Sequence, residues 1–324
     1  MKAAVLYSKG EAPQCIDIPE PVPQNDQEVL VSVKAVALKH LDKSRAKGMH
    51  YSTEHDNKQD AKVIGGDGVC LLPDGTRIYT AGASGMMAEK AIVEKDRIVR
   101  LPAGLDDITA AALPNAVIGA AMALRFRAGI QPGDTVLING ATGFTGRVAV
   151  QIARHYGAGK IIATGRNAQS LKELLTLGAD EILSIQQADE EFTARLSQIH
   201  RITPINVIVD YLWGHTAELI LASMKGDGSF TQRTRFVSVG AVTGDMIQLS
   251  AANLRSVDLQ LSGSGLGSWT KQQIGILFSE ILPEMFQLAA DGKLKIETTP
   301  VALADIGKLW EADMPDGRRL VVQI

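Results

Sequence analysis

Cysteine is scarce in this 324-residue sequence, which contains only Cys15 and Cys70. Two cysteines cannot form the disulfide framework that stabilises small secreted proteins. Neither belongs to a Cys-x-x-Cys pair of the type found in structural zinc sites. The pattern suits the reducing environment of the cytosol, so we expect a cytoplasmic protein.

An excess of charge of one sign is also missing, because 33 Lys and Arg residues balance 36 Asp and Glu residues to a formal net charge of -3. Long hydrophobic runs are missing too. The apolar N-terminus, Met1–Tyr7, is too short for the core of a signal peptide, and the apolar stretch Ala110–Leu124 contains Pro114 and falls short of the roughly 20 residues that span a bilayer. These absences predict neither a nucleic-acid partner nor a membrane partner.

Hydrophobic residues make up an ordinary 45% of the chain, and its length at roughly 150 residues per domain predicts two domains. From Gln131 to about Gly265, β-branched runs alternate with amphipathic stretches of about three turns. The first such stretch, Thr145–Tyr156, is followed by Gly157, a residue that favours the end of a helix. Six runs are expected to be strands: Thr135–Ile138, Lys160–Thr164, Glu181–Ile185, Ile205–Leu212, Arg235–Val239 and Val257–Leu261. Strands this apolar are covered on both faces, so the sequence predicts an α/β fold with a doubly wound parallel sheet of the Rossmann type.

The remaining segments have a different pattern. Before Leu113 the sequence shows short strands, several prolines and a Leu72–Thr76 turn, which together predict a mostly antiparallel β domain. After about Leu266 we expect an amphipathic helix over Lys271–Ala290 and two short strands, Ile296–Val301 and Arg319–Ile324. The pattern of this tail could complete either domain. We divide the chain into residues 1–118, 119–265 and 266–324.

The first strand of the parallel sheet runs into a glycine-rich segment, Asn139–Gly146. In the dinucleotide-binding fingerprint G-x-G-x-x-G, glycines permit a tight turn, the approach of the pyrophosphate and close packing of helix on strand. Here Ala141 takes the first position, and Gly143 and Gly146 take the others. A plain connection is the alternative, but the flanking strand and helix favour phosphate binding at the helix N-terminus. The expected contacts are Thr142, Gly143, Phe144, Thr145 and Gly146.

The second strand leads into Gly165, Arg166 and Asn167, about 20 residues beyond this loop. An NAD site places an acidic residue here for the ribose 2′-hydroxyl, whereas an NADP site omits the acid and supplies a cation. The segment therefore favours NADP(H) over NAD(H). The alternative is that Arg166 is an ordinary surface arginine, although a cation before a helix is disfavoured by the helix dipole unless an anion is close.

Seven segments occur in the order found in one enzyme superfamily: Met1–Val5, Val33–Asp42, Ile64–Val69, Ala110–Pro114, Gly140–Gly146, Leu177–Asp180 and Val237–Gly240. Through them the chain resembles the medium-chain dehydrogenase/reductase superfamily, in its zinc-independent quinone reductase-like branch. The resemblance implies a β-rich, GroES-like catalytic domain over residues 1–118, to which residues 266–324 return. It implies nicotinamide binding between the domains, and a homodimer joined through the last strand of the cofactor sheet.

Further cofactor contacts are expected after the later strands of the sheet. Tyr211 follows the fourth strand, where it could contact the adenosine half of the cofactor or pack under the sheet edge. The remaining expected contacts are Gly240, Ala241, Ser264, Gly265 and Leu266.

The resemblance places Lys39, Gly66 and Asn115 at the positions of the three catalytic zinc ligands of the related alcohol dehydrogenases. None replaces a thiolate or imidazole ligand well, so we expect no metal. Hydride transfer creates negative charge on the acceptor oxygen. We expect Lys39, with Tyr51 or Asn115, to donate hydrogen bonds to that oxygen. The alternative is that Lys39 faces solvent or pairs with Asp42.

The favoured interpretation is an NADPH-dependent, metal-independent reductase that transfers hydride to a quinone or an α,β-unsaturated carbonyl. An alkenal/enoyl reductase or a carbonyl reductase fits the same pattern. A different class, a non-catalytic NADPH-binding redox sensor or partner module, would keep the glycine loop and Arg166 but lack a competent pocket; the unusual pair Lys39 and His40 favours it to some degree.

Overall fold

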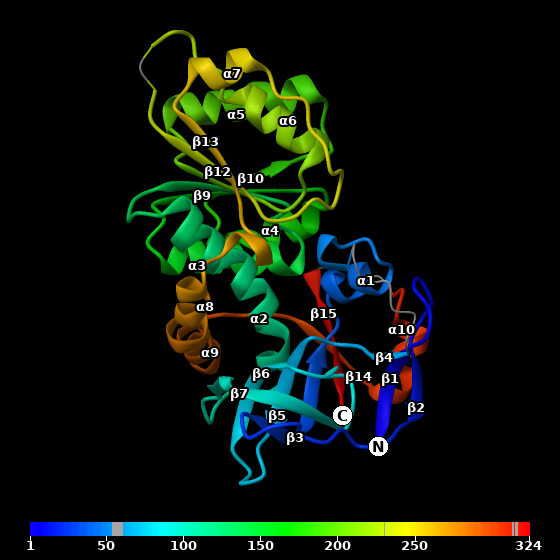
Figure 1. Ribbon diagram of the computed structural model, residues 1–324. Coiled ribbons are helices and arrows are strands. Elements are labelled where there is room, and N and C mark those ends of the chain that lie inside the picture. The colour runs from blue at the N-terminus through cyan, green and yellow to red at the C-terminus, as the bar shows by residue number, and fades with distance from the viewer. Residues whose placement is uncertain (54–60, 230, 313, 315–316) are drawn as a thin grey trace. The chain divides into compact units, whose positions relative to one another are not determined.

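The computed structural model describes residues 1–53, 61–229, 231–312, 314 and 317–324, without the side chain of Tyr51 (Figure 1). The chain divides into two compact units. One comprises Met1–Asn115 together with Phe278–Ile324, and the other comprises Ala116–Leu277. The predicted boundaries, after residues 118 and 265, lie near these divisions and stay predictions.

The second unit is built on a six-stranded sheet in the order β10-β9-β8-β11-β12-β13, and every neighbouring pair is parallel. Its strands are β8 (Thr135–Asn139), β9 (Lys160–Gly165), β10 (Glu181–Ser184), β11 (Val207–Asp210), β12 (Thr234–Ser238) and β13 (Leu259–Gly263). The predicted α/β class and its six parallel strands are therefore confirmed. The strands are apolar throughout because both faces of the sheet are covered.

Helices lie on both sides of this sheet, with α3 and α4 on one face and α5, α6 and α7 on the other (Figure 1). Their bounds are α3 (Phe144–His155), α4 (Ala168–Thr176), α5 (Asp189–Ile202), α6 (Gly214–Ser223) and α7 (Ala251–Ser256). Phe192 and Leu196 of α5 pack with Leu137 and Phe236 of the sheet in one buried cluster. Gly157, just beyond α3, has a φ of 88°, so the predicted helix end is confirmed.

The first unit contains two sheets, β2-β1-β4 and β14-β15-β3-β5-β6-β7. All pairs are antiparallel except β14 with β15, as the predicted antiparallel β domain requires. The strands are β1 (Lys2–Leu6), β2 (Gln14–Asp17), β3 (Glu28–Ala37), β4 (Lys62–Val63), β5 (Asp67–Leu71), β6 (Arg77–Gly82), β7 (Lys90–Arg100), β14 (Thr298–Ala302) and β15 (Arg319–Gln323). The short helices are α1 (His40–Ala46), the 3₁₀ turn Tyr51–Thr53 and α10 (Ile306–Leu309).

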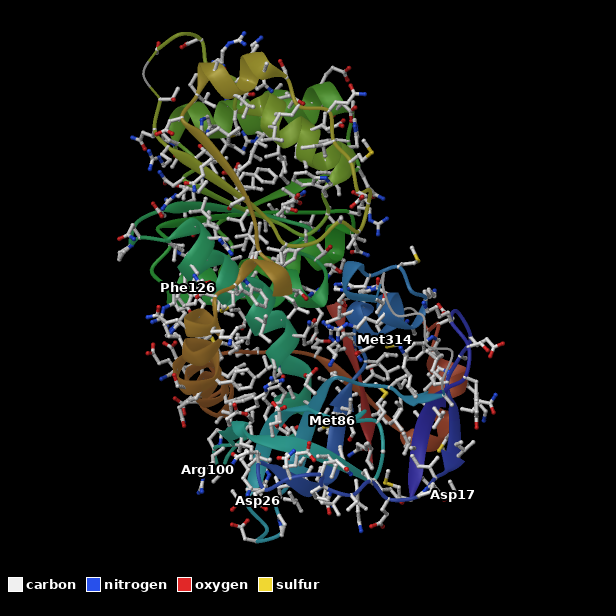
Figure 2. The ribbon with its side chains drawn as sticks, viewed as in Figure 1. Asp17, Asp26, Met86, Arg100, Phe126 and Met314 are labelled. Atoms are coloured by element: carbon white, nitrogen blue, oxygen red, sulfur yellow. The ribbon has the colours of Figure 1, made fainter. Side chains whose placement is uncertain are left out.

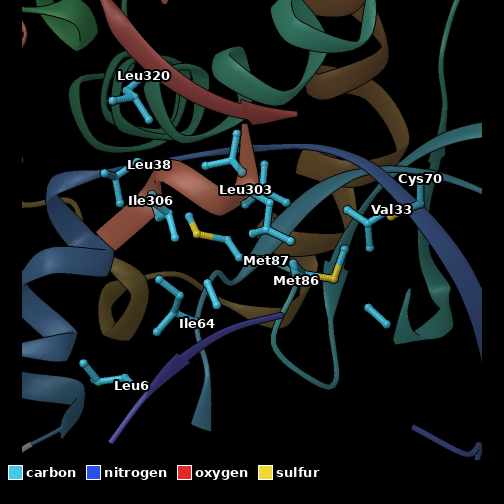
Figure 3. Packing of buried hydrophobic residues seen from close by; sticks show 14 of the residues in the cluster. Leu6, Val33, Leu38, Ile64, Cys70, Met86, Met87, Leu303, Ile306 and Leu320 are labelled. Atoms are coloured by element: carbon cyan, nitrogen blue, oxygen red, sulfur yellow. The ribbon is translucent and has the colours of Figure 1, made fainter. Parts of the chain in front are cut away.

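The C-terminal tail completes this first unit, because β15 pairs with β3 through Val321 opposite Ala37 and Val322 opposite Val36. One core joins early and late residues. Met86, labelled in Figure 2, is fully buried with Leu38, Ile306 and Leu320 (Figure 3). The tertiary structure thus settles the choice between the two domains that the pattern of the tail left open.

Helix α2 (Asp107–Met122) continues through Pro114 and, with the π-helical segment Ala123–Ala128, forms a helix of 22 residues. By length and composition this helix could cross a membrane. The sequence-based estimate of its apolar length was too short, because Pro114 and Asn115 do not end the helix. Its most apolar part is 67% buried inside the protein, as in the core helix of a globular fold.

The predicted helix over Lys271–Ala290 is present as three contiguous segments. They are α8 (Lys271–Ile276), the π-helical segment Leu277–Ile281 and α9 (Leu282–Ala290). The side chain of Thr270 accepts a hydrogen bond from the backbone N–H of Gln273 at 3.1 Å and begins α8 as an N-cap.

Candidate functional site

All predicted cofactor contacts lie at one edge of the parallel sheet. They follow the carboxyl ends of β8, β9, β11, β12 and β13. The carboxyl ends of parallel strands meet at the same edge, and β8 lies between β9 and β11, where the order of strands reverses direction. Ligands of doubly wound folds bind at such a switch point. The topology therefore brings the predicted residues to one edge, while their contacts with a cofactor stay predictions.

The glycine loop after β8 is shaped by a left-handed residue at Gly140 and by a close approach of backbone at Gly146. Gly140 has a φ of 84°, so the left-handed residue of the turn precedes the position that the fingerprint assigned to Ala141. A Cβ on Gly146 would lie 2.4 Å from the carbonyl oxygen of Gly140. A Cβ on Gly143 would meet only that same oxygen, at 3.8 Å. The loop is thus tightly packed at Gly146 and open at Gly143, as a phosphate cradle requires.

Arg147 ties this loop to two helices. Its Nε donates a hydrogen bond to the carbonyl oxygen of Thr142 at 3.2 Å, and its Nη2 forms an ion pair with Glu173 of α4 at 2.6 Å. The Arg147 side chain is largely buried, whereas that of Glu173 is partly exposed. Sequence reasoning missed Arg147, because a charged residue in the first turns of an amphipathic helix resembles a solvated one.

A buried polar network lies directly beneath the loop. Asn139 donates to Asp210 at 2.7 Å and accepts from the hydroxyl of Thr164 at 2.7 Å, so the ends of β8, β9 and β11 are linked. Burial raises the pKa of Asp210, and hydrogen bonds from Leu212, Asn139 and Trp213 oppose that rise. The Asp210 carboxylate thereby orders the turn after β11.

Strain in that turn explains why such an anchor is needed. Trp213 has a φ of 59°, the only positive φ at a non-glycine residue in the described part of the chain. Its backbone N–H donates to Asp210 at 3.1 Å, and its indole N–H donates to the carbonyl oxygen of Asp245 at 3.1 Å. A bulky residue adopts this conformation only where surrounding contacts enforce it.

The end of β9 has the form expected of an NADP site. A Cβ on Gly165 would lie 2.4 Å from Cγ2 of Thr142, so a glycine is required where the loop crosses the strand. Arg166 is exposed, and in the described residues no ion pair or hydrogen bond of its side chain occurs. Asn167 accepts a hydrogen bond from Ser170 N–H at 2.9 Å and caps α4. The cation is therefore available to a ligand, whereas the amide oxygen already has a structural partner.

Tyr211 and Ser264 also have partners within the second unit. Tyr211 is buried, and its hydroxyl donates to the carbonyl oxygen of Gly119 at 3.5 Å. Ser264 accepts a hydrogen bond from the indole of Trp269 at 3.2 Å. The packing alternative for Tyr211 is thus realised, and its contact with a cofactor stays a prediction.

The first unit holds a buried network of charges around Lys39. Its side chain is 2% exposed, and its ammonium donates to Asp67 and lies 3.7 Å from Asp42. The backbone N–H of Lys39 donates to Asp42 at 2.9 Å, and the hydroxyl of Tyr79 donates to Asp67 at 2.9 Å. Arg319, at the start of β15, donates to the carbonyl oxygen of Leu38 at 3.3 Å. The network therefore links α1, β5, β6 and β15.

The charges in this network balance. Burial lowers the pKa of Lys39, but the carboxylates of Asp42 and Asp67 outweigh burial and raise it above its ordinary value. Burial lowers the pKa of Arg319 to about 10, and the same two carboxylates oppose the shift. Two cations and two carboxylates thus form one compensated group. The alternative in which Lys39 pairs with Asp42 is realised, and it is extended by Asp67.

For the two other predicted catalytic residues, Asn115 and Tyr51, the part of the chain that the structure describes shows no side-chain contact that bears on their role. Asn115 is half-buried in α2, and among the described residues its side chain has no hydrogen bond. Tyr51 begins a 3₁₀ turn, and its side chain lies outside the described residues. The roles of Lys39, Asn115 and Tyr51 in chemistry stay predictions.

Known proteins share both units. The sequence model of the zinc-binding dehydrogenase family matches residues 145–288. A probable NADPH-dependent quinone reductase of Emericella nidulans is 26% identical over 99% of each chain. The quinone oxidoreductase of Thermus thermophilus, solved also with NADPH, superposes over the whole of both chains with a TM-score of 0.79 at 26% identity. By sequence and by fold, the chain is thus similar to the quinone oxidoreductase-like medium-chain dehydrogenase/reductases. The Escherichia coli quinone oxidoreductase, solved with NADPH, has the same fold, with a TM-score of 0.83 at 21% identity over the whole of both chains.

Within this quinone oxidoreductase-like chain, the positions matched to zinc ligands do not fit a zinc ion. Lys39 is a cation held by two carboxylates, Gly66 has no side-chain donor, and Asn115 offers only an amide. In the described parts of the chain, no three His, Cys, Asp or Glu side chains are grouped so as to hold a metal. Independence from zinc stays a prediction.

Sequence reasoning missed the partners of Lys39 in this quinone oxidoreductase-like fold. Asp67 follows Gly66 directly, so its place beside a matched ligand position was a usable signal. The sequence contained no comparable signal for Tyr79 and Arg319. These residues lie 40 and 280 positions from Lys39, and only the pairing of their strands brings them into the same network.

Proposed function

We propose that the chain is an NADPH-dependent reductase that transfers hydride to a quinone or an α,β-unsaturated carbonyl without a metal ion. The observation that carries the proposal is the end of β9. Arg166 is exposed there and has no partner among the described residues. It follows Gly165, where the close approach of Thr142 in the glycine loop leaves no room for a side chain. The likeness of the whole chain to NADPH-dependent quinone reductases supports the same class of reaction.

The residues at the sheet edge fit NADPH. Gly143 leaves room above the loop for a pyrophosphate, and the free N–H groups of the first turn of α3 point to the same place. Arg166 would hold the 2′-phosphate. When bound, NADPH supplies a hydride, and a proton from solvent completes the reduction of a quinone to a hydroquinone. The chain contributes binding, orientation and exclusion of water.

Lys39 is the proposed source of positive charge near the acceptor oxygen. Its ammonium is buried against Asp67, so it would act as the positive end of this ion pair and not as a free cation. Asp67 keeps a 19% exposed side chain, and its carboxylate accepts hydrogen bonds from Lys39 and Tyr79. Asn115 and Tyr51 would donate directly to the acceptor oxygen.

The activity is tested by following NADPH oxidation with a panel of quinones, enals, enoyl thioesters and ketones. We expect turnover with quinones and enones and little with simple ketones. Turnover of enoyl thioesters alone would assign an enoyl reductase. No turnover with any acceptor despite tight NADPH binding would overturn the proposal in favour of a redox sensor.

Replacing Arg166 with alanine should weaken NADPH binding by about ten- to a hundredfold, because a charge-assisted bond to the phosphate contributes roughly 1.5–3 kcal/mol. NADH binding should not change, since NADH has no 2′-phosphate. Titration calorimetry with both cofactors measures the effect. Lys172→Ala, which removes an exposed cation from α4, is the matched control. Equal NADPH affinity in wild type and Arg166→Ala would exclude the assigned role.

We also propose a cytoplasmic homodimer joined through β13. This strand is the edge of the parallel sheet and pairs only with β12 among the described residues. Its free edge offers backbone groups to a second copy. Light scattering after gel filtration should give twice the mass of one chain, and Leu261→Pro should reduce it to one. Cell fractionation tests the location. A monomeric wild type would contradict the proposed interface.

A further inference from the structure

A small cavity of about 150 Å³ lies wholly within the first unit, between α1 and the segment that leads into β5. Its apolar wall includes Leu6, Ala46 and Ile64. Its polar wall includes Asp42 and Arg45 of α1. A cavity of this volume is large enough for one small ring.

Arg45 is the unusual member of this wall. Helix α1 and the residue that caps it present three neighbouring cations, Lys43, Arg45 and Lys47. Lys43 donates to the carbonyl oxygen of Ala312 at 3.1 Å, and Lys47 forms an ion pair with Glu311 at 3.2 Å. Arg45 is half-buried, and in the described residues no carboxylate or carbonyl oxygen accepts a hydrogen bond from its guanidinium. Solvent or a bound ligand must therefore accept the hydrogen bonds of this guanidinium.

Among the described residues, the other charges that line the cavity do not neutralise Arg45. Asp42 is the acid of the wall, but its carboxylate already accepts from the backbone of Lys39 and lies 3.7 Å from the Lys39 ammonium. Lys62 adds a second cation to the lining. Burial, and then the charge of Arg45, lower the pKa of His50 nearby. In the described part of the chain, no acid of the lining therefore pairs with Arg45.

Access to the guanidinium depends on a glycine. A Cβ on Gly66 would lie 3.7 Å from Nη1 of Arg45, and among the described residues other than its chain neighbours no further heavy atom would lie within 4 Å of it. A larger side chain at position 66 would fill the space in front of Arg45. The glycine thus leaves that space to a ligand.

We propose that Arg45 binds a carboxylate on the substrate, so that the preferred acceptor is a quinone or enone that carries an acidic group. The planar guanidinium matches a carboxylate with two parallel hydrogen bonds. The apolar wall accommodates the ring or short chain that bears it. This inference rests on the proposed reductase function for the identity of the acceptor, although the anion site itself does not.

Binding without cofactor tests the site directly. The probes are benzoate and its uncharged analogue benzamide, measured by titration or saturation-transfer NMR on the full chain. Wild type should bind benzoate at least about tenfold more tightly than benzamide, as a charge-assisted bond requires. Arg45→Met should remove this preference, and Arg45→Lys should keep part of it. Arg255→Met, which removes an exposed arginine from α7, should keep all of it. Equal affinities for the two probes in wild type would overturn the inference.

Kinetics separate this inference from the proposed function. With 1,4-naphthoquinone-2-carboxylate, Arg45→Met should lose about ten- to a hundredfold in kcat/KM, mainly through KM, because the carboxylate that loses its contact is itself unchanged by the reaction. With 1,4-naphthoquinone it should lose less than about twofold. Equal losses with both acceptors would overturn the inference and leave the reductase standing. A benzoate preference without reduction of either quinone would support the anion site and count against the reductase.

Discussion

Replacing Lys39 with methionine is expected to lower the free energy of unfolding of the first unit by about 3–5 kcal/mol, the usual cost of breaking a buried ion pair. The thermal midpoint of that unit should fall by roughly 10 °C. Methionine fills a similar volume, so the loss arises from charge and not from a cavity. The buried Asp42 and the partly buried Asp67 would be left with Arg319 as the neighbouring cation. Calorimetry of wild type and variant measures both quantities.

The matched control for this prediction is the double variant Lys39→Met with Asp67→Asn. Removing one carboxylate leaves Asp42 and Arg319 as a balanced pair, so about half of the lost stability should return. A single variant as stable as wild type would show that the network does not hold the fold.

The catalytic role of Lys39 is read from the same variants at a temperature where each is folded. If Lys39 acts through its charge, both should lose at least about tenfold in kcat with NADPH affinity unchanged, because one oxyanion-stabilising group is commonly worth more than that. A kcat equal to that of wild type in the stable double variant would remove Lys39 from the mechanism.

Replacing Gly146 with alanine is expected to lower the affinity for NADPH by at least about a hundredfold. The added Cβ would lie 2.4 Å from the carbonyl oxygen of Gly140 and 2.5 Å from Cα of Ala141. Both are backbone atoms and cannot rotate away, so the loop must move from the helix N-terminus that we propose as the phosphate site. Quenching of NADPH fluorescence on titration measures the loss.

Two other glycines make this prediction specific. Gly275→Ala, in α8, meets nothing within 4 Å and should leave binding unchanged. The Cβ of Gly143→Ala would meet only the Gly140 oxygen, at 3.8 Å, so the stability of the fold should not change. If the cofactor occupies the space above Gly143, the affinity of this variant for NADPH should fall. Normal NADPH affinity in Gly146→Ala would refute the assignment of the loop.

Much of the second unit could be predicted from sequence because its signals are local. The run Thr135–Ile138 is buried at every position, as a strand covered on both faces must be. Gly157 adopts a left-handed conformation just beyond the end of α3. Arg147 and Asp210 escaped prediction. Whether a charged side chain is buried depends on neighbours such as Glu173 and Asn139, which are distant in the sequence.

The surroundings of Lys39 in the first unit could not be predicted from the sequence. The sequence by itself determined the α/β class, the glycine loop, the cation at the end of β9 and the absence of zinc-ligating side chains at Lys39, Gly66 and Asn115. Only the tertiary structure decided that the tail joins β3 and that Lys39 is buried between two carboxylates. Local patterns report the backbone and the faces of single elements, whereas pairing between distant strands decides which charges share a low-dielectric interior and must compensate one another.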